Sequence, residues 1–267
     1  MIVIKTTSEI AQIEENGALL AEVLDLIAEA VRPGVSTAEL DRLAESAIRA
    51  CGGSPSFKGY NGFPASICAS INDEVVHGIP TRRRKLAAGD IVSVDVGLLR
   101  GGYHADSART FPVGEVSETA RRLIRVTEAC LERGIAQVAP GRTLGDVGSA
   151  IQSHAEEAGF HVVRELVGHG IGTRLHEDPQ VPNYGARGEG LTLRPGMVLA
   201  IEPMVNVGTA RVETLDDAWT IRTLDGSLSA HFEHTVAVTN EGCRVLTAPG
   251  RLTSTQAPAA PRRASLA

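Results

Sequence analysis

The sequence of 267 residues is poor in aromatic residues and cysteine, and it contains no long apolar run. Phe, Tyr and Trp make up only 3% of the chain, so a cluster of them would be informative. The four cysteines include no C-x-x-C pair, which disfavours a thiolate zinc site and favours free thiols in a reducing compartment. No segment approaches the roughly 20 apolar residues that cross a bilayer, and the N-terminus lacks a signal region. We therefore expect a cytoplasmic protein without membrane contact.

Positive charge is also scarce. Lys and Arg number 26 against 32 Asp and Glu, which gives a net charge of −6. This balance favours solubility and predicts no DNA partner. The exception is TRRRKL at 81–86, which concentrates four positive charges. Such a run is usually solvated surface. The functional alternative is a transient contact with ribosomal RNA.

The hydrophobic pattern predicts a mixture of helices and strands. Apolar residues recur at helical spacing over 8–31, and a second helix begins at Ser36, which forms a capping-box motif with Glu39. Further helices are expected over 118–138 and 143–158. Shorter β-branched segments predict strands at 91–97, 103–112, 197–204, 217–224 and 230–239. Residues 251–267 are expected to be a flexible C-terminal tail, which leaves 1–250 as a single domain.

Four short motifs occur twice in the same order, separated by insertions. The pairs are VRPG (31–34) with VAPG (138–141), HGIP (77–80) with HGIG (169–172), LAAGDIVSVD (86–95) with LRPGMVLAIE (193–202), and HAD (104–106) with HFE (231–233). Chance similarity between short segments is the alternative. The shared order favours two related halves that face one another across an approximate twofold axis. The alignment sets Asp95 against Glu202 and Asp106 against Glu233.

Asp95 and Asp106 are expected on the two strands of one hairpin. A turn at Arg100-Gly101-Gly102 would place them opposite one another, or nearly so, where β-carbons lie roughly 4.5–5.5 Å apart. Two carboxylates at this distance repel, which raises one pKa. A divalent cation between them would remove the repulsion. For this pair alone, a solvated strand end with both carboxylates facing water is the alternative.

The second half supplies three further candidate ligands. Glu202 lies in an otherwise apolar strand, where an unpaired carboxylate would be costly, and Glu233 is the counterpart of Asp106. His169 lies between glycines, which let backbone segments approach closely. Five ligands rich in oxygen and free of sulfur suit two Mn²⁺, Fe²⁺, Co²⁺ or Zn²⁺ ions better than a structural zinc. Two such ions would lower the pKa of a shared water and polarise a carbonyl, which predicts hydrolysis without naming the bond.

Longer motifs can be compared with a known family. VDVG with Asp106 eleven positions after Asp95, GHGIG, LHEDPQVPNYG, AIEPM, FEHT and the segment SPSFKGYNGFPASICASINDEVVHGIP resemble type I methionine aminopeptidases of the bacterial type, in peptidase family M24. The resemblance runs from about residue 4 to 248. It implies an α+β pita-bread fold, in which two pseudo-twofold-related halves form a central curved antiparallel sheet covered by helices.

The resemblance implies roles for the candidate residues. The family's metal ligands map onto Asp95, Asp106, His169, Glu202 and Glu233, and Asp106 and Glu233 would bridge two divalent ions (Co, Mn, Fe or Zn). Glu202 would also be the general base. His176 would donate a hydrogen bond to the oxyanion, and His77 would position the scissile amide or protonate the leaving amine. Taken alone, each of these two histidines is better explained by packing against a loop.

The family's pocket for the methionine side chain maps onto six residues. They are Phe57, Tyr60, Phe63, Cys68, Leu175 and Trp219. Four of the six are aromatic in a chain with only 3% aromatic residues, although packing in the core is the default role for Phe57 and Leu175, where relatives vary in residue type. His77 and His176 would also contact the substrate. The family further implies a monovalent cation near Asn72 and Ser229.

The implied activity is removal of the initiator methionine from nascent polypeptides whose second residue is small, by a monomeric enzyme. The interval of 202 − 169 = 33 positions between two of the ligands leaves no room for the long insert of type II enzymes. The N-terminus also lacks the zinc-finger extension of eukaryotic type I relatives.

Two alternatives remain open. A Xaa-Pro aminopeptidase or prolidase shares the fold and the metal chemistry, but it usually carries an additional N-terminal domain and a shorter interval between its two glutamates than the 233 − 202 = 31 positions found here. A pita-bread binding protein without activity is the other. Such relatives have lost metal ligands, whereas all five candidate ligands are present in this chain.

Overall fold

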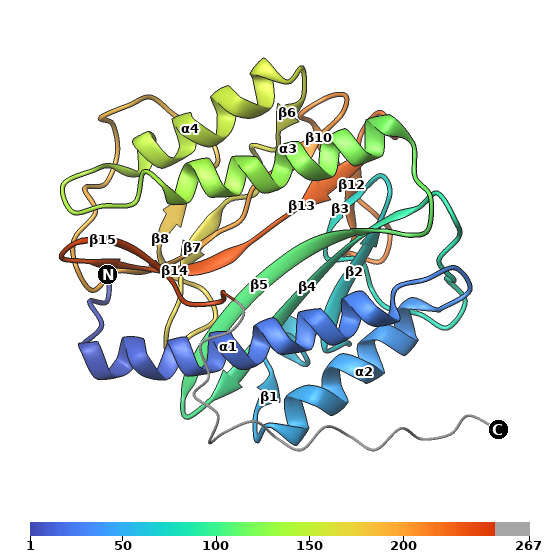
Figure 1. Cartoon of the computed structure of the whole chain (residues 1–267), viewed down its shortest axis with the longest axis horizontal. Helices are drawn as coiled ribbons and strands as arrows, with labels where there is room; N and C mark the ends of the chain where they lie inside the picture. Colours follow the sequence, from blue (N-terminus) through green and yellow to red (C-terminus); the bar gives the residue numbers. More distant parts are fainter. Residues whose placement is uncertain (249–267) are drawn as a thin grey trace.

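Four helices cover antiparallel strands in the computed structural model, which describes residues 1–248 (Figure 1). The helices are α1 (Thr7–Ala30), α2 (Thr37–Ala50), α3 (Glu118–Ile135) and α4 (Leu144–Glu157). Each lies within a few residues of its predicted bounds. α1 and α2 pack along the strands of the first half, and α3 and α4 along those of the second. The predicted flexible tail, 251–267, lies outside the described residues.

The longest helix, α1, forms because its apolar residues share one face. Ile13, Leu20, Leu24 and Ile27 are all 0% exposed and recur at spacings of seven, four and three residues. Burial of each side chain stabilises the fold by roughly 1.5–3 kcal/mol. The helix begins at a capping box, in which the Thr6 hydroxyl accepts a hydrogen bond from the backbone of the third helical residue.

The strands are mostly short, and one hairpin stands out by its length. They are β1 (Ser54–Pro55), β2 (Ile67–Ile71), β3 (Glu74–Val76), β4 (Ile91–Arg100), β5 (Tyr103–Pro112), β6 (His161–Val162), β7 (Gly168–Gly170), β8 (Glu177–Val181), β9 (Val198–Ile201), β10 (Met204–Asn206), β11 (Val212–Thr214), β12 (Ile221–Thr223), β13 (Ser229–His231), β14 (His234–Thr239) and β15 (Gly242–Val245). A single 3₁₀ turn, η1, spans Tyr60–Gly62. The predicted strands 197–204 and 230–239 are each two strands with a gap between them.

Two larger sheets carry the architecture, and every strand pairing in the described residues is antiparallel. In the first sheet, β4 pairs with β1, β2 and β5. In the second, the order is β15-β14-β9-β7-β8. Two three-stranded sheets, β13-β10-β6 and β11-β12-β3, flank them. In the first half β4 lies between β2 and β5, and in the second half β9 lies between β7 and β14. β4 and β9 are therefore equivalent strands of the two halves.

The internal repeat predicted from the motifs is confirmed by matching hydrogen bonds. In the first half, Gly34 N donates to Leu86 O (2.7 Å) and Leu86 N donates to Val35 O (2.8 Å). In the second half, Gly141 N donates to Leu193 O (3.0 Å), and Leu193 N donates back to the next residue, Arg142 (2.7 Å). The aligned motifs thus make the same contacts. The predicted pita-bread fold with two related halves is correct.

The two halves share their hydrophobic interior. One core cluster joins α1, α2 and β4 to residues of the second half such as Val198 and Ala237, and a second cluster joins α3 and α4 to β9 and β14. Within residues 1–248, no helix is both long and apolar enough to span a membrane.

Candidate metal centre

The first half brings two carboxylates to one face of the β4–β5 hairpin. Asp95 pairs with Ala108, and Asp106 pairs with Gly97. The two aspartates are therefore diagonal neighbours and not directly opposite, because the turn is centred one residue later than the sequence indicated, with Arg100 facing Tyr103. Residues two positions apart on a strand face the same side, so both carboxylates still point the same way.

A seam between β5 and β14 joins the two halves beside these aspartates. Glu233 N donates to Ala108 O (2.9 Å). The Thr235 hydroxyl accepts from Asp106 N (3.0 Å) and lies 2.8 Å from Asp106 O, and the Ser107 hydroxyl donates to Glu233 O (2.8 Å). Asp95 pairs with Ala108, and Ala108 is hydrogen-bonded to Glu233 on its other side. Asp95 and Glu233 therefore lie in line across β5, on the same face.

The second half adds Glu202 and His169 to these side chains. β14 pairs with β9 from His234 and Ile201 onward, so Glu233 and Glu202 directly precede and follow this pair. His169 pairs with Ala200, two positions before Glu202. All five candidate ligands line one cavity. The prediction that they converge from distant parts of the chain is therefore supported by the geometry.

The glycines beside His169 allow β7 to lie close to its neighbours, as predicted. A β-carbon on Gly168 would lie 2.3 Å from Ala200 O, and one on Gly170 would lie 2.1 Å from Asp178 O. The His169 ring is 12% exposed, and its Nδ1 donates to Gly170 O (2.9 Å). Because Nδ1 carries the proton, Nε2 has a free lone pair, and it points toward Glu202 Oε1 at 3.5 Å.

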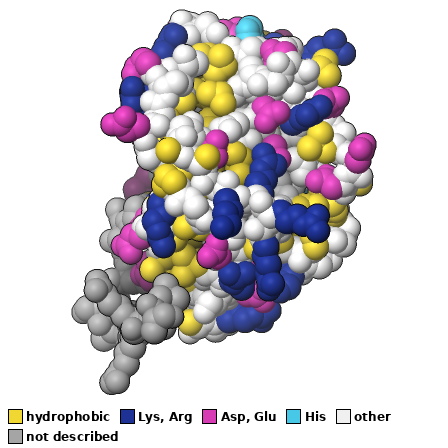
Figure 2. All heavy atoms as spheres, turned by 90° about the vertical axis from the view of Figure 1, so that its right-hand side faces the viewer, with side chains coloured by type: hydrophobic (Ala, Val, Ile, Leu, Met, Phe, Trp, Pro, Cys, Tyr) yellow, Lys and Arg dark blue, Asp and Glu magenta, His cyan; other side chains and the backbone are white. Residues whose placement is uncertain are grey.

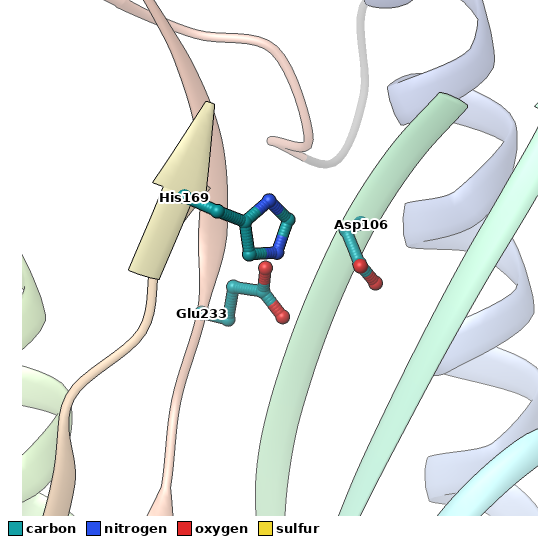
Figure 3. Close-up of side chains that lie close together, drawn as sticks. All are labelled: Asp106, His169 and Glu233. Carbon is teal, nitrogen blue, oxygen red and sulfur yellow. The ribbon is translucent and has the colours of Figure 1, made fainter. Parts of the chain in front are cut away.

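Three of these side chains lie close enough together to share one ion. Asp106 on β5, His169 on β7 and Glu233 just before β14 point toward one another (Figure 3), with ligand atoms within 4.8 Å of one another. Asp95 Oδ1, Asp106 Oδ1 and Glu233 Oε1 are buried without a hydrogen-bond partner in the described part of the chain. Buried carboxylate oxygens without partners are costly, and a cation would satisfy them. The residues present fit a divalent metal ion.

The protonation of the protein without metal reflects this crowding. Burial raises the pKa of Asp95 to about 7. Burial, together with the Asp95 charge, raises the pKa of Asp106 and that of Glu202 well above their usual ranges. Burial and the Asp106 charge do the same for Glu233. Burial lowers the pKa of His169 to about 3, so its imidazole is neutral at pH 7 and able to bind a metal.

A cavity of about 220 Å³ opens directly onto the ligands. Its walls include all six residues predicted for the side-chain pocket: Phe57, Tyr60, Phe63, Cys68, Leu175 and Trp219. Trp219 and Phe63 pack edge to face, with ring centroids 5.1 Å apart. The volume lies below the roughly 300–1,000 Å³ of sites for drug-sized ligands, and it suits a single apolar side chain.

The two histidines predicted to be catalytic border the same cavity. His176 Nδ1 lies 2.7 Å from the Tyr60 hydroxyl, and the centroids of the His176 and His169 rings are 4.3 Å apart. His77 is half-buried, and the centroid of its ring lies 6.4 Å from that of Trp219. Burial lowers the pKa of His77 to about 4. Both histidines lie within the site and not merely against a loop.

Sequence reasoning missed two residues of the site. Asn61 lines the cavity from η1 and has a left-handed backbone (φ 48°). The Tyr-Asn-Gly turn could have indicated it, because Asn is tolerated there. His231 is buried, and its Nε2 lies 3.7 Å from Glu202 Oε2. The sequence indicates His231 only as the counterpart of His104, because its contact with Glu202 depends on how the chain leaves β13 before Glu233.

The residues predicted to lie near a monovalent cation are in contact. Ser229 N donates to Asn72 O (2.8 Å). The Asn72 side chain is already engaged, since its amide donates to Asp90 (2.8 Å) and its carbonyl oxygen accepts from Ile91 N (3.0 Å). Backbone carbonyl groups are therefore the ligands available to a cation at this point.

This geometry defines a metallopeptidase-like site, and comparisons with known proteins agree. The model of metallopeptidase family M24 matches residues 11–240. The chain belongs to metallopeptidase family M24. Its relatives include a methionine aminopeptidase of Clostridium acetobutylicum, 52% identical over 92% of this chain and 99% of the relative, and methionine aminopeptidase 1 of Bacillus subtilis, 51% identical over the same shares.

Solved structures give the same result. The crystal structure of methionine aminopeptidase from Rickettsia prowazekii superposes with a TM-score of 0.91 at 44% identity, covering 93% of this chain and all of that one. A Xaa-Pro dipeptidase from Bacillus anthracis superposes with a TM-score of 0.73 at 26% identity. That match covers 91% of this chain but only 61% of the dipeptidase.

Proposed function

We propose that this chain is a methionine aminopeptidase, which hydrolyses the first peptide bond of polypeptides that begin with methionine. The observation that carries the proposal is the cavity of about 220 Å³ whose walls combine the five candidate ligands with aromatic side chains. A pocket of this size suits one side chain, as removal of a single N-terminal residue requires. Relatives about 50% identical over nearly their whole length bear the name methionine aminopeptidase, which supports the same activity.

A second, larger cavity adjoins the first at the candidate ligands. It has a volume of about 580 Å³ and shares His77, His169, His176 and Glu202 with the first. The scissile bond would lie at this junction, and the rest of the polypeptide would leave through the second cavity. The second residue of the substrate would be surrounded by these four side chains, which favours a small residue there.

Asp95, Asp106, His169, Glu202 and Glu233 would hold two divalent ions. When bound, such ions supply a water of lowered pKa and polarise the scissile carbonyl. Glu202 would take the proton of the attacking water, and His231, 3.7 Å away, would help to orient that carboxylate. His176 would donate a hydrogen bond to the developing oxyanion. His77 would hold the scissile amide or protonate the leaving amine.

The test is reconstitution of metal-free protein under anaerobic conditions with Mn²⁺ or Fe²⁺ and the peptide Met-Ala-Ser. We expect activity to rise with added metal and to level off near two equivalents, and we expect Met-Leu-Ser to be cleaved at least tenfold more slowly. Absence of cleavage at every metal level would contradict the proposal. A plateau at one equivalent would contradict the two-ion site alone.

The competing activity is cleavage before proline. The dipeptidase match supports this alternative through its fold, but that protein has a large additional part that this chain does not cover. A comparison of Met-Ala-Ser with Ala-Pro-Gly at equal concentration separates the two activities. Faster cleavage of Ala-Pro-Gly would favour the alternative.

The setting of the proposed reaction is a monomeric cytoplasmic enzyme acting on nascent chains, in which residues 1–250 form one catalytic domain. Figure 2 shows Lys and Arg side chains gathered on the side of the molecule that includes the α1–α2 turn. Residues 81–86 lie against this turn, because Thr37 N donates to Arg84 O (3.1 Å). A transient contact of this face with ribosomal RNA would bring the site close to emerging chains.

Arg84 is unsuitable for testing the ribosome contact because it pairs with the buried carboxylate of Glu74. The exposed residues Arg82 and Arg83 are free of that role. We expect the double variant Arg82→Glu/Arg83→Glu to lose co-sedimentation with ribosomes while cleaving Met-Ala-Ser at the original rate. Unchanged co-sedimentation would leave these residues as solvated surface.

A further inference from the structure

A buried ion pair joins the first residues of the chain to the loop that carries His176. Lys5 Nζ lies 2.6 Å from Glu177 Oε2, and the two side chains are only 2% and 1% exposed. In no other Lys or Arg pair within residues 1–248 are both side chains less than 10% exposed. Removing two charges from water is costly unless the geometry is good. The proposed reaction has so far assigned no role to this pair.

The two oxygens of the Glu177 carboxylate have different partners: one binds groups within the loop, and the other binds Lys5. Its Oε1 accepts hydrogen bonds from Arg174 N (3.1 Å) and from the Thr173 hydroxyl (3.5 Å). Its Oε2 is the atom bound by Lys5. His176 is therefore held inside a closed turn whose end is tied to a different part of the chain.

Lys5 is in turn fixed by the backbone of the second half. Lys5 N donates to Gly196 O (2.8 Å), and Gly196 N donates to Val238 O (2.9 Å) on β14. Gly172 leaves the space for the pair, because a β-carbon there would lie 2.6 Å from Lys5 Cε and 2.8 Å from Glu177 Oε1. The ion pair thus ties the 172–177 loop, which ends where β8 begins, to the segment before α1 and, through Gly196, to β14.

We propose that Lys5 and Glu177 are positioning residues, which hold the 172–177 loop so that the His176 imidazole faces the scissile carbonyl. This inference rests on the proposed function. In residues 1–248 the His176 side chain forms a hydrogen bond with the Tyr60 hydroxyl, and its ring packs against that of His169. A displacement of about 1 Å at such a group can cost on the order of 10²-fold in rate. The position of the ring therefore depends on how firmly the loop backbone is fixed.

The first variant to test is Lys5→Met, which keeps the length of the side chain and removes its charge. We expect kcat for Met-Ala-Ser to fall by roughly 10- to 100-fold while KM stays within about threefold, because His176 acts in the transition state. Arg109→Met is the matched control. It breaks the Arg109–Asp25 pair (2.7 Å), which joins β5 to α1 away from the loop, and it should leave kcat unchanged. A kcat of Lys5→Met within twofold of the original would overturn the proposal.

Two double variants separate positioning from simple stabilisation. Lys5→Met/Glu177→Gln removes the stranded charge but keeps an acceptor for Arg174 N, so the melting temperature should recover while kcat stays low. Recovery of both would show that the pair serves stability alone. In a His176→Ala background, Lys5→Met should cause no further loss of kcat, since both changes act through one group. An additional tenfold loss there would contradict the assignment.

A readout that is independent of activity keeps this inference apart from the proposed function. Amide hydrogen exchange of residues 172–177 should speed up at least tenfold in Lys5→Met and not in Arg109→Met. If the unaltered protein failed to cleave Met-Ala-Ser, the proposed function would fail, and the exchange rates would still decide whether the pair fixes the loop. Unchanged exchange in Lys5→Met would refute it.

Discussion

The two halves of the molecule supply equivalent carboxylates from different backbones. Asp95 lies inside β4 and Asp106 inside β5, two strands of ten residues each. The residues before and after each aspartate are paired between these two strands. Glu202 lies in the gap between β9 and β10, and Glu233 lies in the gap between β13 and β14. At each gap the chain passes between the five-stranded sheet and a three-stranded one.

The difference teaches how side-chain length and backbone work together. Inside the continuous strands β4 and β5 the carboxylate is carried by the shorter aspartate. At the two points where the chain changes sheets it is carried by the longer glutamate. The repeat therefore keeps a carboxylate at each aligned position, although the backbone that presents it differs.

The largest expected effect is a difference in activity between variants of Glu202, the proposed base, and of Asp95, its counterpart in the first half. Glu202→Gln removes the proton acceptor, and we expect kcat at saturating Mn²⁺ to fall by about 10³-fold or more. Asp95→Asn should mainly weaken metal binding, so a large share of its lost activity should return at high Mn²⁺. Activity titrated against Mn²⁺ for both variants is the measurement. Similar rescue of both would mean that the two halves are functionally equivalent.

Swapping side-chain lengths tests the comparison directly. Glu233→Asp withdraws the carboxylate by one methylene at a break, and we expect roughly a 10²-fold loss of kcat. Asp106→Glu inserts a methylene into a buried position on an intact strand, and we expect mainly a loss of stability of about 1–3 kcal/mol. Steady-state kinetics and thermal melting of both variants decide the matter. Equal losses of activity and stability in the two variants would break the comparison.

Removal of metal should make stability depend on pH through these carboxylates. Burial raises the pKa of Asp95 to about 7, and burial together with the Asp95 charge raises the pKa of Asp106 well above its usual range. A raised pKa in the folded state stabilises the fold below the unfolded value, and that contribution is lost as pH rises toward the folded value. Buried His169, with its pKa lowered to about 3, acts only below about pH 6.5. The metal-free protein should therefore melt several degrees lower at pH 8 than at pH 6.5.

Thermal melts with and without saturating Mn²⁺ at these two pH values provide the check, since bound cations neutralise the carboxylates. We expect the drop between pH 6.5 and 8 to disappear with metal and to shrink in Asp106→Asn. A metal-free melting temperature that rises with pH would contradict the assigned directions of the pKa shifts.

The smallest expected effect is on stability, and it concerns the helix caps, which are alike in the two halves. Ser36 and Thr143 each begin the second helix of a half with a capping box, and each forms an isolated bridge, to Lys85 and to Thr192. Ser36→Ala and Thr143→Ala should each cost about 1 kcal/mol of stability. Urea titration of both variants checks this. A difference above about 1 kcal/mol would mean that the repeat does not extend to the energetics of the caps.

The helices and the β4–β5 hairpin could be predicted because their signals are local. Caps, apolar spacing and the Gly101-Gly102 turn all lie within the elements that they define. The breaks at Glu202 and Glu233 could not, because 197–204 and 230–239 keep a strand-like composition while the chain changes sheets. A pattern of residue types does not record which partner strand each residue meets.

The site was predicted largely through a resemblance, and its physics was visible only in part. The repeat indicated Asp95, Asp106, Glu202 and Glu233 as equivalent pairs without reference to any family. The contact of His231 with Glu202 was not visible, since it depends on the seam between the halves. The Lys5–Glu177 pair was also missed, because charges 177 − 5 = 172 positions apart carry no local signal.

The seam also bears on how the protein matures. The ligands span 233 − 95 = 138 positions and come from both sides of the β5–β14 junction. A ribosome synthesising this chain finishes the hairpin with two aspartates long before the partner glutamate exists. An unfinished chain therefore holds only the two aspartates, and the five side chains can come together only after the second half has been made.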